Sequence, residues 1–233
     1  MTYTISPEVL SLAPDLVVYL LVAKDITNTA GDEHDEHILR QAEHEFRQRY
    51  GESDIRSLAT VAAYRGLMEK AGINPNRFPP SIEAMLKRIA KGGQLPLINK
   101  VVDRLNAISL RTQLSMGSHD RRELSEDLSL RLTQDGDRFL PLGEQTWEDV
   151  PAGELAWVSG NEIQTRRGLW RQSELGKTDL DTTAVYFHLV AFEAQAEAID
   201  QAVSLIRELI HELGGSAELY RIDSTQPVAE WHS

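Results

Sequence analysis

The sequence contains no cysteine among its 233 residues. Disulfides, thiolate catalysis and cysteine-ligated zinc or iron–sulfur clusters are therefore excluded. Long apolar runs are also missing, because the longest covers only the eight residues 16–23, whereas a membrane helix needs about 20. No basic start followed by an apolar stretch marks a signal peptide. We therefore expect a soluble cytoplasmic protein with no membrane partner.

Several catalytic and nucleotide-binding signatures are absent as well. The chain has no glycine-rich phosphate loop, no Gly-x-Gly-x-x-Gly and no Gly-x-Ser-x-Gly nucleophile elbow. His34, His37 and His44 lie among acidic residues at a spacing that could hold a divalent metal. Acidic residues also gather at helix starts, where they oppose the helix dipole. We favour this second explanation and expect neither a metal nor a cofactor.

Charge is unevenly distributed along the chain. The net charge is −12, yet segment 56–122 holds twelve basic and four acidic residues, a net charge of +8 that leaves −20 for the rest. Exposed charges act mainly within a Debye length of about 10 Å, so this basic segment could attract a polyanion locally. The alternative is that these side chains are the solvated faces of ordinary helices.

Hydrophobic periodicity predicts mainly helices in the first half of the chain and strands in the second. Helices are expected at 36–50, 56–71, 81–91, 97–112 and 194–213, and strands at 16–23, 128–132, 139–142, 154–158, 162–165, 183–190 and 217–222. Two hairpins are expected, one between 128–132 and 139–142 and one between 154–158 and 162–165. Ser81 is a candidate helix cap. Without strict β-α-β alternation, this order predicts an α+β fold with a mixed or antiparallel sheet packed with helices.

Three polar residues are candidates for a site. His119 and Asp120 end the basic segment in a predicted loop that contains Gly and Ser, where catalytic groups often lie. Asn106 falls on or beside the inward stripe of its helix, so its amide either anchors the following loop or contacts a ligand. His188 lies in a predicted core strand, where a structural role is favoured.

Four stretches then occur in an order that resembles a known family. They are 80–85 (Pro-Ser-Ile-Glu-Ala-Met), 98–106 (Ile-Asn-Lys-Val-Val-Asp-Arg-Leu-Asn), Gly153-Glu154, and 167–173 (Arg-Gly-Leu-Trp-Arg-Gln-Ser) before Thr182-Thr183. This order is similar to that of free-standing proteins related to the B-three/B-four tRNA-binding and editing domain of the phenylalanyl-tRNA synthetase beta subunit. The resemblance covers about residues 64–222, and its most specific element is Asn-x-Val-Val-Asp-x-x-Asn at 99–106.

The resemblance implies an activity. Such a domain accepts the end of an aminoacylated tRNA and hydrolyses a misattached amino acid, which is tyrosine in the synthetase. The implied catalytic residues are His119 and Glu174, and the implied substrate pocket comprises Asn106, Asp120 and Ser173.

The chain departs from the family pattern at three positions. The synthetase's histidine falls on Gly117, and its glutamate falls on Ser173 or Glu174, depending on the motif from which residues are counted. An arginine of the family corresponds to Pro96 in this chain, so its positive charge is missing unless Arg88 or Lys91 supplies it. The resemblance therefore implies the scaffold more strongly than the editing chemistry.

The expected partner is tRNA or aminoacyl-tRNA, without specificity for DNA. Its phosphates would contact Lys87, Arg88, Lys91, Lys100 and Arg104, which we place on outward helical faces. Two alternatives stay open: a non-enzymatic scaffold that binds a free amino acid or another small ligand, and a purely structural interaction module. We expect residues 56–223 to form the tRNA-binding domain, with 1–55 as part of the same fold and 224–233 as a loose tail.

Overall fold

A four-stranded antiparallel sheet forms the centre of the computed structural model, which describes residues 1–124 and 126–231. Its strand order is β11 (Ser216–Ile222), β2 (Leu16–Lys24), β10 (Val185–Phe192) and β3 (Ser115–Asp120). Every residue of β10 is buried, as expected for a strand covered on both faces. The first part of the chain thus supplies a central strand of this sheet, because β2 lies between β11 and β10.

A second, mixed sheet consists of eight short strands, counted over residues 1–124 and 126–231. Along the sheet the order is β12 (Val228–Glu230), β1 (Thr2–Ile5), β4 (Leu128–Leu132), β7 (Leu155–Ser159), β8 (Glu162–Arg166), β5 (Arg138–Phe139) and β6 (Glu148–Asp149), with β9 (Arg171–Gln172) also paired to β8. Two of its pairings, β1 with β4 and β5 with β8, are parallel. The two sheets meet through side chains, since the Trp157 ring of β7 stacks on the His188 ring of β10.

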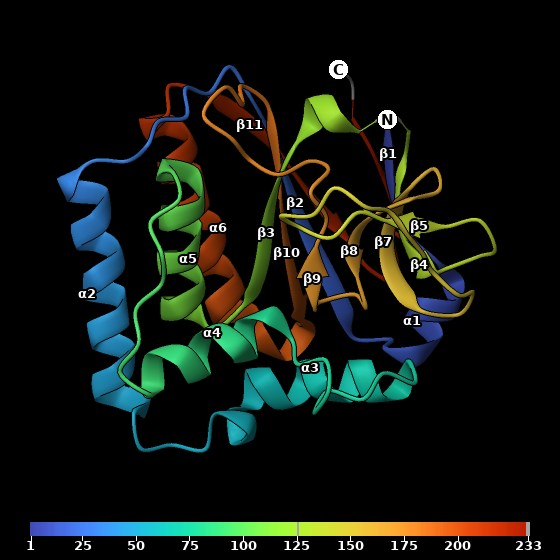
Figure 1. Cartoon of the computed structure of the whole chain (residues 1–233), viewed down its shortest axis with the longest axis horizontal. Helices are drawn as coiled ribbons and strands as arrows, with labels where there is room; N and C mark the ends of the chain where they lie inside the picture. Colours follow the sequence, from blue (N-terminus) through green and yellow to red (C-terminus); the bar gives the residue numbers. More distant parts are fainter. Residues whose placement is uncertain (125, 232–233) are drawn as a thin grey trace.

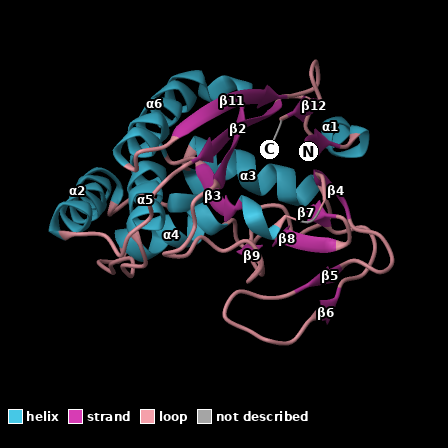
Figure 2. Cartoon of the chain, turned by 90° about the horizontal axis from the view of Figure 1, so that it is seen from above, coloured by secondary structure: helices cyan, strands magenta, loops and turns pink. Residues whose placement is uncertain are grey.

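In the described parts of the chain, six α-helices surround the sheets: α1 (Pro7–Leu12), α2 (Glu33–Tyr50), α3 (Ala59–Lys70), α4 (Ser81–Ala90), α5 (Lys100–Thr112) and α6 (Ala196–Glu212). Short 3-10 turns lie at Ile55–Ser57, Arg121–Glu123 and Glu193–Gln195. Apolar side chains of α5 and α6 cover one face of the central sheet, and α3 and the second sheet contribute to the core on the other face. Figure 1 shows α2, α5 and α6 grouped on one side and the second sheet on the other, with α3 and α4 crossing below; Figure 2 gives the same grouping from above.

The predicted fold class is confirmed: the chain is α+β, with a mixed and an antiparallel sheet packed with helices. The expected hairpin 154–158/162–165 is also confirmed, as the antiparallel pair β7–β8. The hairpin expected between 128–132 and 139–142 is wrong. β4 pairs with β1 and β7, and β5 pairs with β6 and β8, so the β7–β8 hairpin lies between them.

Three local expectations also differ from the structure. Ser81 is the first residue of α4 rather than its cap, and its backbone N–H donates to the Leu169 carbonyl at 2.7 Å. His119 and Asp120 lie in β3 and not in a loop. The expected loose tail contains β12, which pairs with β1, followed by the buried Trp231; the last two residues of that segment, 232–233, lie outside the described residues.

Within the two described ranges, none of the helices combines the length and the apolar character that a membrane crossing requires.

Candidate functional site

A cavity of about 170 Å³ lies at the meeting of the two sheets and α4. Its polar lining includes Asn106 of α5, His119 of β3, Thr165 of β8, Gln172 of β9 and His188 of β10, together with Ser81, Ser115 and Arg171. Its apolar wall consists of Met85, Met116, Leu169 and Trp170. The five elements α5, β3, β8, β9 and β10, from three separate parts of the sequence, thus place polar groups around one small space.

Two histidines face each other in this cavity. The β3–β10 register pairs His119 with Tyr186 and Gly117 with His188, so that the two imidazoles project from the same face of the central sheet. Their ring centroids are 5.0 Å apart. The His119 ring stacks on Tyr186 at 4.8 Å and 4°, and the His188 ring stacks on Trp157 at 5.4 Å and 19°. Aromatic contacts therefore fix the orientation of both imidazoles.

Burial makes both imidazoles neutral at physiological pH. It lowers the pKa of His188 to about 4. Burial first, and then the neighbouring His188, lower the pKa of His119 well below its ordinary value. A neutral imidazole carries one nitrogen that can accept a proton, so each ring has the protonation state of a general base.

Gly117 gives the His188 ring its space. A Cβ at Gly117 would lie only 2.6 Å from Nε2 of His188. The other ring nitrogen, Nδ1, is buried and has no hydrogen-bond partner in the part of the protein described. Both side-chain polar atoms of the buried Gln164 also lack a partner there. Because buried polar groups are normally hydrogen-bonded, Nδ1 of His188, a residue that lines the cavity, gives the cavity unused capacity to bind a polar ligand. Gln164 is not among the residues that line it.

The structure brings only some of the predicted site residues together. Asn106 and His119 line the cavity, whereas Asp120, Ser173 and Glu174 do not. Ser173 is fully buried; its hydroxyl donates to the Leu140 carbonyl at 2.9 Å and accepts from the Leu175 N–H at 3.1 Å. With these bonds the Ser173 side chain stabilises the backbone of the segment that follows β9.

Asp120 also has structural partners. Its carboxylate accepts hydrogen bonds from the Arg122 guanidinium and, at 2.8 Å, from the Thr182 hydroxyl. Burial alone would raise the pKa of Asp120, but the bonds from Arg122 and Thr182 outweigh it and lower the pKa. Asp120 therefore ties β3 to the segment that precedes β10.

Glu174 lies at a separate depression of about 290 Å³, which Asp120 and Lys177 also line. Its carboxylate pairs with the Lys177 ammonium and accepts from the Gly143 N–H at 2.8 Å, and these two contacts lower its pKa. The two residues expected to be catalytic, His119 and Glu174, thus do not share a cavity.

Three of the five cations expected to contact RNA are paired with carboxylates of the protein itself. Lys87 pairs with the fully buried Glu83, Lys100 lies 3.5 Å from Asp35, and Arg104 holds both Asp35 and Glu212. The other two, Arg88 and Lys91, are exposed, and within 1–124 and 126–231 neither has a carboxylate at ion-pair distance. A phosphate that approached a paired cation would have to compete with a carboxylate already in place.

Of the five polar residues assigned above to named elements, sequence reasoning did not predict Thr165, Gln172 and His188 as site residues. The alternation of β10 contained a signal for His188, because Tyr186 and His188 lie on one face while the apolar Val185, Phe187 and Leu189 lie on the other. No comparable signal marks Gln172, whose position depends on the pairing of β9 with β8.

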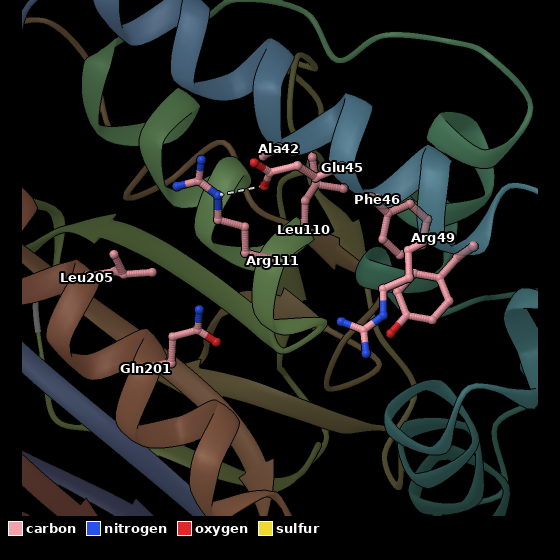
Figure 3. Close-up of a pocket in the computed structure, with 9 residues that line it drawn as sticks. Ala42, Glu45, Phe46, Arg49, Leu110, Arg111, Gln201 and Leu205 are labelled. Carbon is pink, nitrogen blue, oxygen red and sulfur yellow. Dashed lines mark ion pairs between the residues drawn. The ribbon is translucent and has the colours of Figure 1, made fainter.

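A second groove, of about 420 Å³, lies between α2, α5 and α6 (Figure 3). Phe46, Leu110 and Leu205 line it, and Arg111 Nε pairs with Glu45 across it at 3.5 Å. It contains none of the residues predicted for a site.

The described residues hold no group of three or more His, Cys, Asp or Glu arranged for a metal. His34, His37 and His44 are exposed on α2. The acidic residues around them serve the helix start, because the Asp32 side chain accepts from the N–H groups of His34 and Asp35.

Comparison with known proteins places this fold in a family. Residues 63–211, more than half of the chain, match the family model described as the B3/4 domain. A solved N-terminal fragment of the phenylalanyl-tRNA synthetase beta subunit from Pyrococcus horikoshii is similar, with 11% identity, a TM-score of 0.45, and coverage of 95% of this chain and 53% of that one. This chain therefore spans about half the length of that fragment. The curated proteins include no match. The resemblance expected from the four motifs is confirmed, and the chain belongs to the B3/4 domain family.

Proposed function

We propose that this protein binds aminoacyl-tRNA and hydrolyses the ester of a misattached amino acid in trans. The observation that carries the proposal is the cavity between the sheets of a B3/4 domain, where two neutral imidazoles lie 5.0 Å apart. The cavity is small and has both polar and apolar walls, which suits the side chain and ester group of one amino acid.

The chemistry needs one proton to be taken up and returned. As the oxygen of a water bonds to the ester carbonyl carbon, the imidazole of His119 or His188 accepts a proton from that water. When the bond from that carbon to the ribose oxygen breaks, the proton passes to the departing oxygen. The amide of Asn106 can donate a hydrogen bond to the carbonyl oxygen while it carries negative charge. The Gln172 amide instead donates to the Ser118 carbonyl at 3.2 Å and lies 3.4 Å from Nδ1 of His119, where it can orient that ring. The products are a free amino acid and deacylated tRNA.

Single-turnover deacylation of mischarged tRNA tests this proposal. Substituting His119→Ala or His188→Ala should lower the rate by about a hundredfold or more, because each removes a possible base. His211→Ala is the matched control, since this histidine is exposed on α6. Glu174→Ala tests whether the carboxylate expected to be catalytic takes part from its separate depression. No rate above background with any aminoacyl ester would dispose of the enzymatic proposal.

Binding can be tested apart from hydrolysis. Contacts to single-stranded phosphates weaken with a log–log salt slope of about −0.7 per contact, whereas a small-molecule pocket is far less sensitive to salt. The affinity for tRNA should therefore fall steeply between low and moderate salt.

The competing function is a scaffold that binds a free amino acid or another small ligand without hydrolysis. The pairing of Lys87, Lys100 and Arg104 with carboxylates favours it, because these cations are then less available to phosphates. Thermal-shift screening separates the two, since a ligand at a hundred times its dissociation constant adds about 2.7 kcal/mol to the free energy of unfolding. A shift with amino acids but none with tRNA would support the scaffold.

A further inference from the structure

Four side chains beside the cavity form a cluster that we call the arginine–aromatic rim: Arg77, Phe78, Arg167 and Trp170. The Phe78 and Trp170 rings meet nearly edge to face, with centroids 5.0 Å apart. The Arg167 guanidinium carbon lies 3.7 Å from the Phe78 centroid and 4.8 Å from the Trp170 centroid, and that of Arg77 lies 5.0 Å from Phe78. Cations and aromatic faces thus alternate within one cluster.

Two segments distant in sequence build the rim. The loop before α4 supplies Arg77 and Phe78, the turn before β9 supplies Arg167 and Trp170, and the bond from the Ser81 N–H to the Leu169 carbonyl joins them. Arg167 has φ +54°, a left-handed conformation that is uncommon outside glycine. In this conformation the Arg167 side chain packs against the Phe78 and Trp170 rings.

The rim carries positive charge that the protein neutralises only in part. Arg77 is exposed and, among the described residues, has no carboxylate at ion-pair distance. Arg167 is 13% exposed and lies 3.4 Å from Glu154, which already accepts two hydrogen bonds of 3.0 Å from Arg166. Burial, followed by the nearby charges of Arg166 and Arg77, lowers the pKa of Arg167. A bound anion would relieve this repulsion.

Trp170 belongs both to the rim and to the wall of the cavity that holds His119 and His188. A ligand with its reacting end in that cavity would pass Trp170 and reach the rim. Aromatic faces beside arginines suit a planar base joined to a phosphate, because every base can stack and guanidinium groups bind phosphate in two places.

We propose that the arginine–aromatic rim binds the 3′-terminal nucleotide of an RNA, with the base stacked on Trp170 and the phosphate paired with Arg77 and Arg167. This assignment rests on the proposed function, since it directs the acylated end of the RNA into the cavity. An acidic peptide would satisfy the arginines but would bring no planar base to stack on an aromatic ring.

The test measures affinity for a short fluorescein-labelled single-stranded RNA, with and without an abasic 3′-terminal nucleotide, by fluorescence anisotropy. Trp170→Leu should weaken binding of the intact RNA by about tenfold, the loss expected when one stacked base loses its aromatic partner. The abasic RNA should bind the unmodified protein about tenfold more weakly and should bind Trp170→Leu with no further loss. Arg77→Gln should weaken binding and reduce the salt slope by about 0.7.

Matched controls separate the rim from general electrostatics. Arg207→Gln removes an exposed cation of α6, and Trp147→Leu removes a tryptophan that also has an arginine, Arg138, over its ring. Both should bind RNA within about twofold of the unmodified protein if base stacking and pairing occur at the rim. Arg77 is exposed, so its variant keeps the test valid even if Trp170→Leu unfolds, which thermal unfolding would reveal.

The outcomes distinguish this proposal from the proposed function. RNA binding that is unchanged in Trp170→Leu and Arg77→Gln, or that responds equally to Arg207→Gln, overturns the rim and leaves the proposed function standing. If RNA binding depends on the rim but no deacylation is detected, the rim is supported as a nucleotide site and the proposal of hydrolysis is rejected. If polyglutamate displaces the labelled RNA and excess unlabelled RNA does not, the rim is not a nucleotide site.

Discussion

His188 and Gly117 face each other across the β3–β10 pair, and the ring of His188 occupies the space where a side chain of Gly117 would begin. The ring cannot readily withdraw, because it is buried and Trp157 stacks against it. The absence of a side chain at position 117 and the presence of an imidazole at 188 are thus two parts of one arrangement.

Gly117→Ala should therefore destabilise the protein and displace the His188 ring. Overpacking of this kind costs about 1–3 kcal/mol, measurable as a fall in the free energy of unfolding in urea. Gly66→Ala is the control: Gly66 lies inside α3, no atom lies within 4 Å of its added Cβ, and it is not in a left-handed conformation. There the substitution should stabilise by about 0.5–1 kcal/mol. A similar gain at Gly117 would contradict the close contact with His188.

The two buried histidines should make stability depend on pH. Because their pKa values are lower in the folded state, protons bind preferentially to the unfolded chain once the pH falls below the ordinary value of about 6.5. For His188 the loss of stability continues down to a pH of about 4. Each histidine contributes a slope of up to about 1.4 kcal/mol per pH unit. Urea denaturation at pH 7, 6 and 5 should show His188→Gln with a shallower decline than the unmodified protein; parallel declines would mean that His188 is protonated in the fold.

The ion pairs of Glu83, in α4, should contribute strongly to the free energy of unfolding. Its carboxylate is fully buried and binds Arg65 at 3.0 Å, Lys87, and Arg56 at 3.6 Å. Glu83→Gln leaves these cations without their shared anion and should cost about 3 kcal/mol. Glu45→Gln removes a half-exposed partner of Arg111 and should change the free energy of unfolding by less than about 1 kcal/mol. Equal effects in urea denaturation would show that the Glu83 cluster is no stronger than a surface pair.

Tyr64 joins α3 to two strands of the central sheet through its hydroxyl. The hydroxyl donates to the Val190 carbonyl at 2.6 Å and accepts from the Ser115 N–H at 3.0 Å, and the side chain is fully buried. Tyr64→Phe leaves both backbone groups without this partner and should cost about 1–3 kcal/mol. Tyr220→Phe, which removes a hydroxyl bonded to the exposed Glu218, should be nearly neutral by thermal unfolding. If Tyr220→Phe destabilises the protein more than Tyr64→Phe does, the hydrogen bonds of the Tyr64 hydroxyl do not contribute appreciably to stability.

Local patterns in the sequence were sufficient for most elements. The apolar run at 16–23 predicted β2, and the stripe at 97–112 predicted α5, although α5 begins only at Lys100 after the Asn99 cap. The failures involve long-range pairing. The separation of β4 from β5 depends on the insertion of the β7–β8 hairpin, and the pairing of β12 with β1 joins the two ends of the chain. Neither of these pairings can be predicted from the hydrophobic periodicity of the strands involved.

The candidate site shows the same division. Asn106 and His119 were identified in advance and both line the cavity, whereas Glu174 was expected beside His119 and lies at another depression. Counting residues from one motif to the next cannot give the direction of a side chain in the turn that follows β9. His188 was assigned a structural role because its strand looked like core, and only the register with Gly117 places it in the cavity.

By itself, the sequence determined most of the longer helices and strands, the excess of acid over base, and the family of the chain, because these properties depend on composition, periodicity and motif order. The tertiary structure decided which cations are already paired, which histidines share a cavity, and where arginine meets aromatic rings. These relationships depend on strand register and on side chains brought together from distant segments, and no local pattern in the chain encodes them.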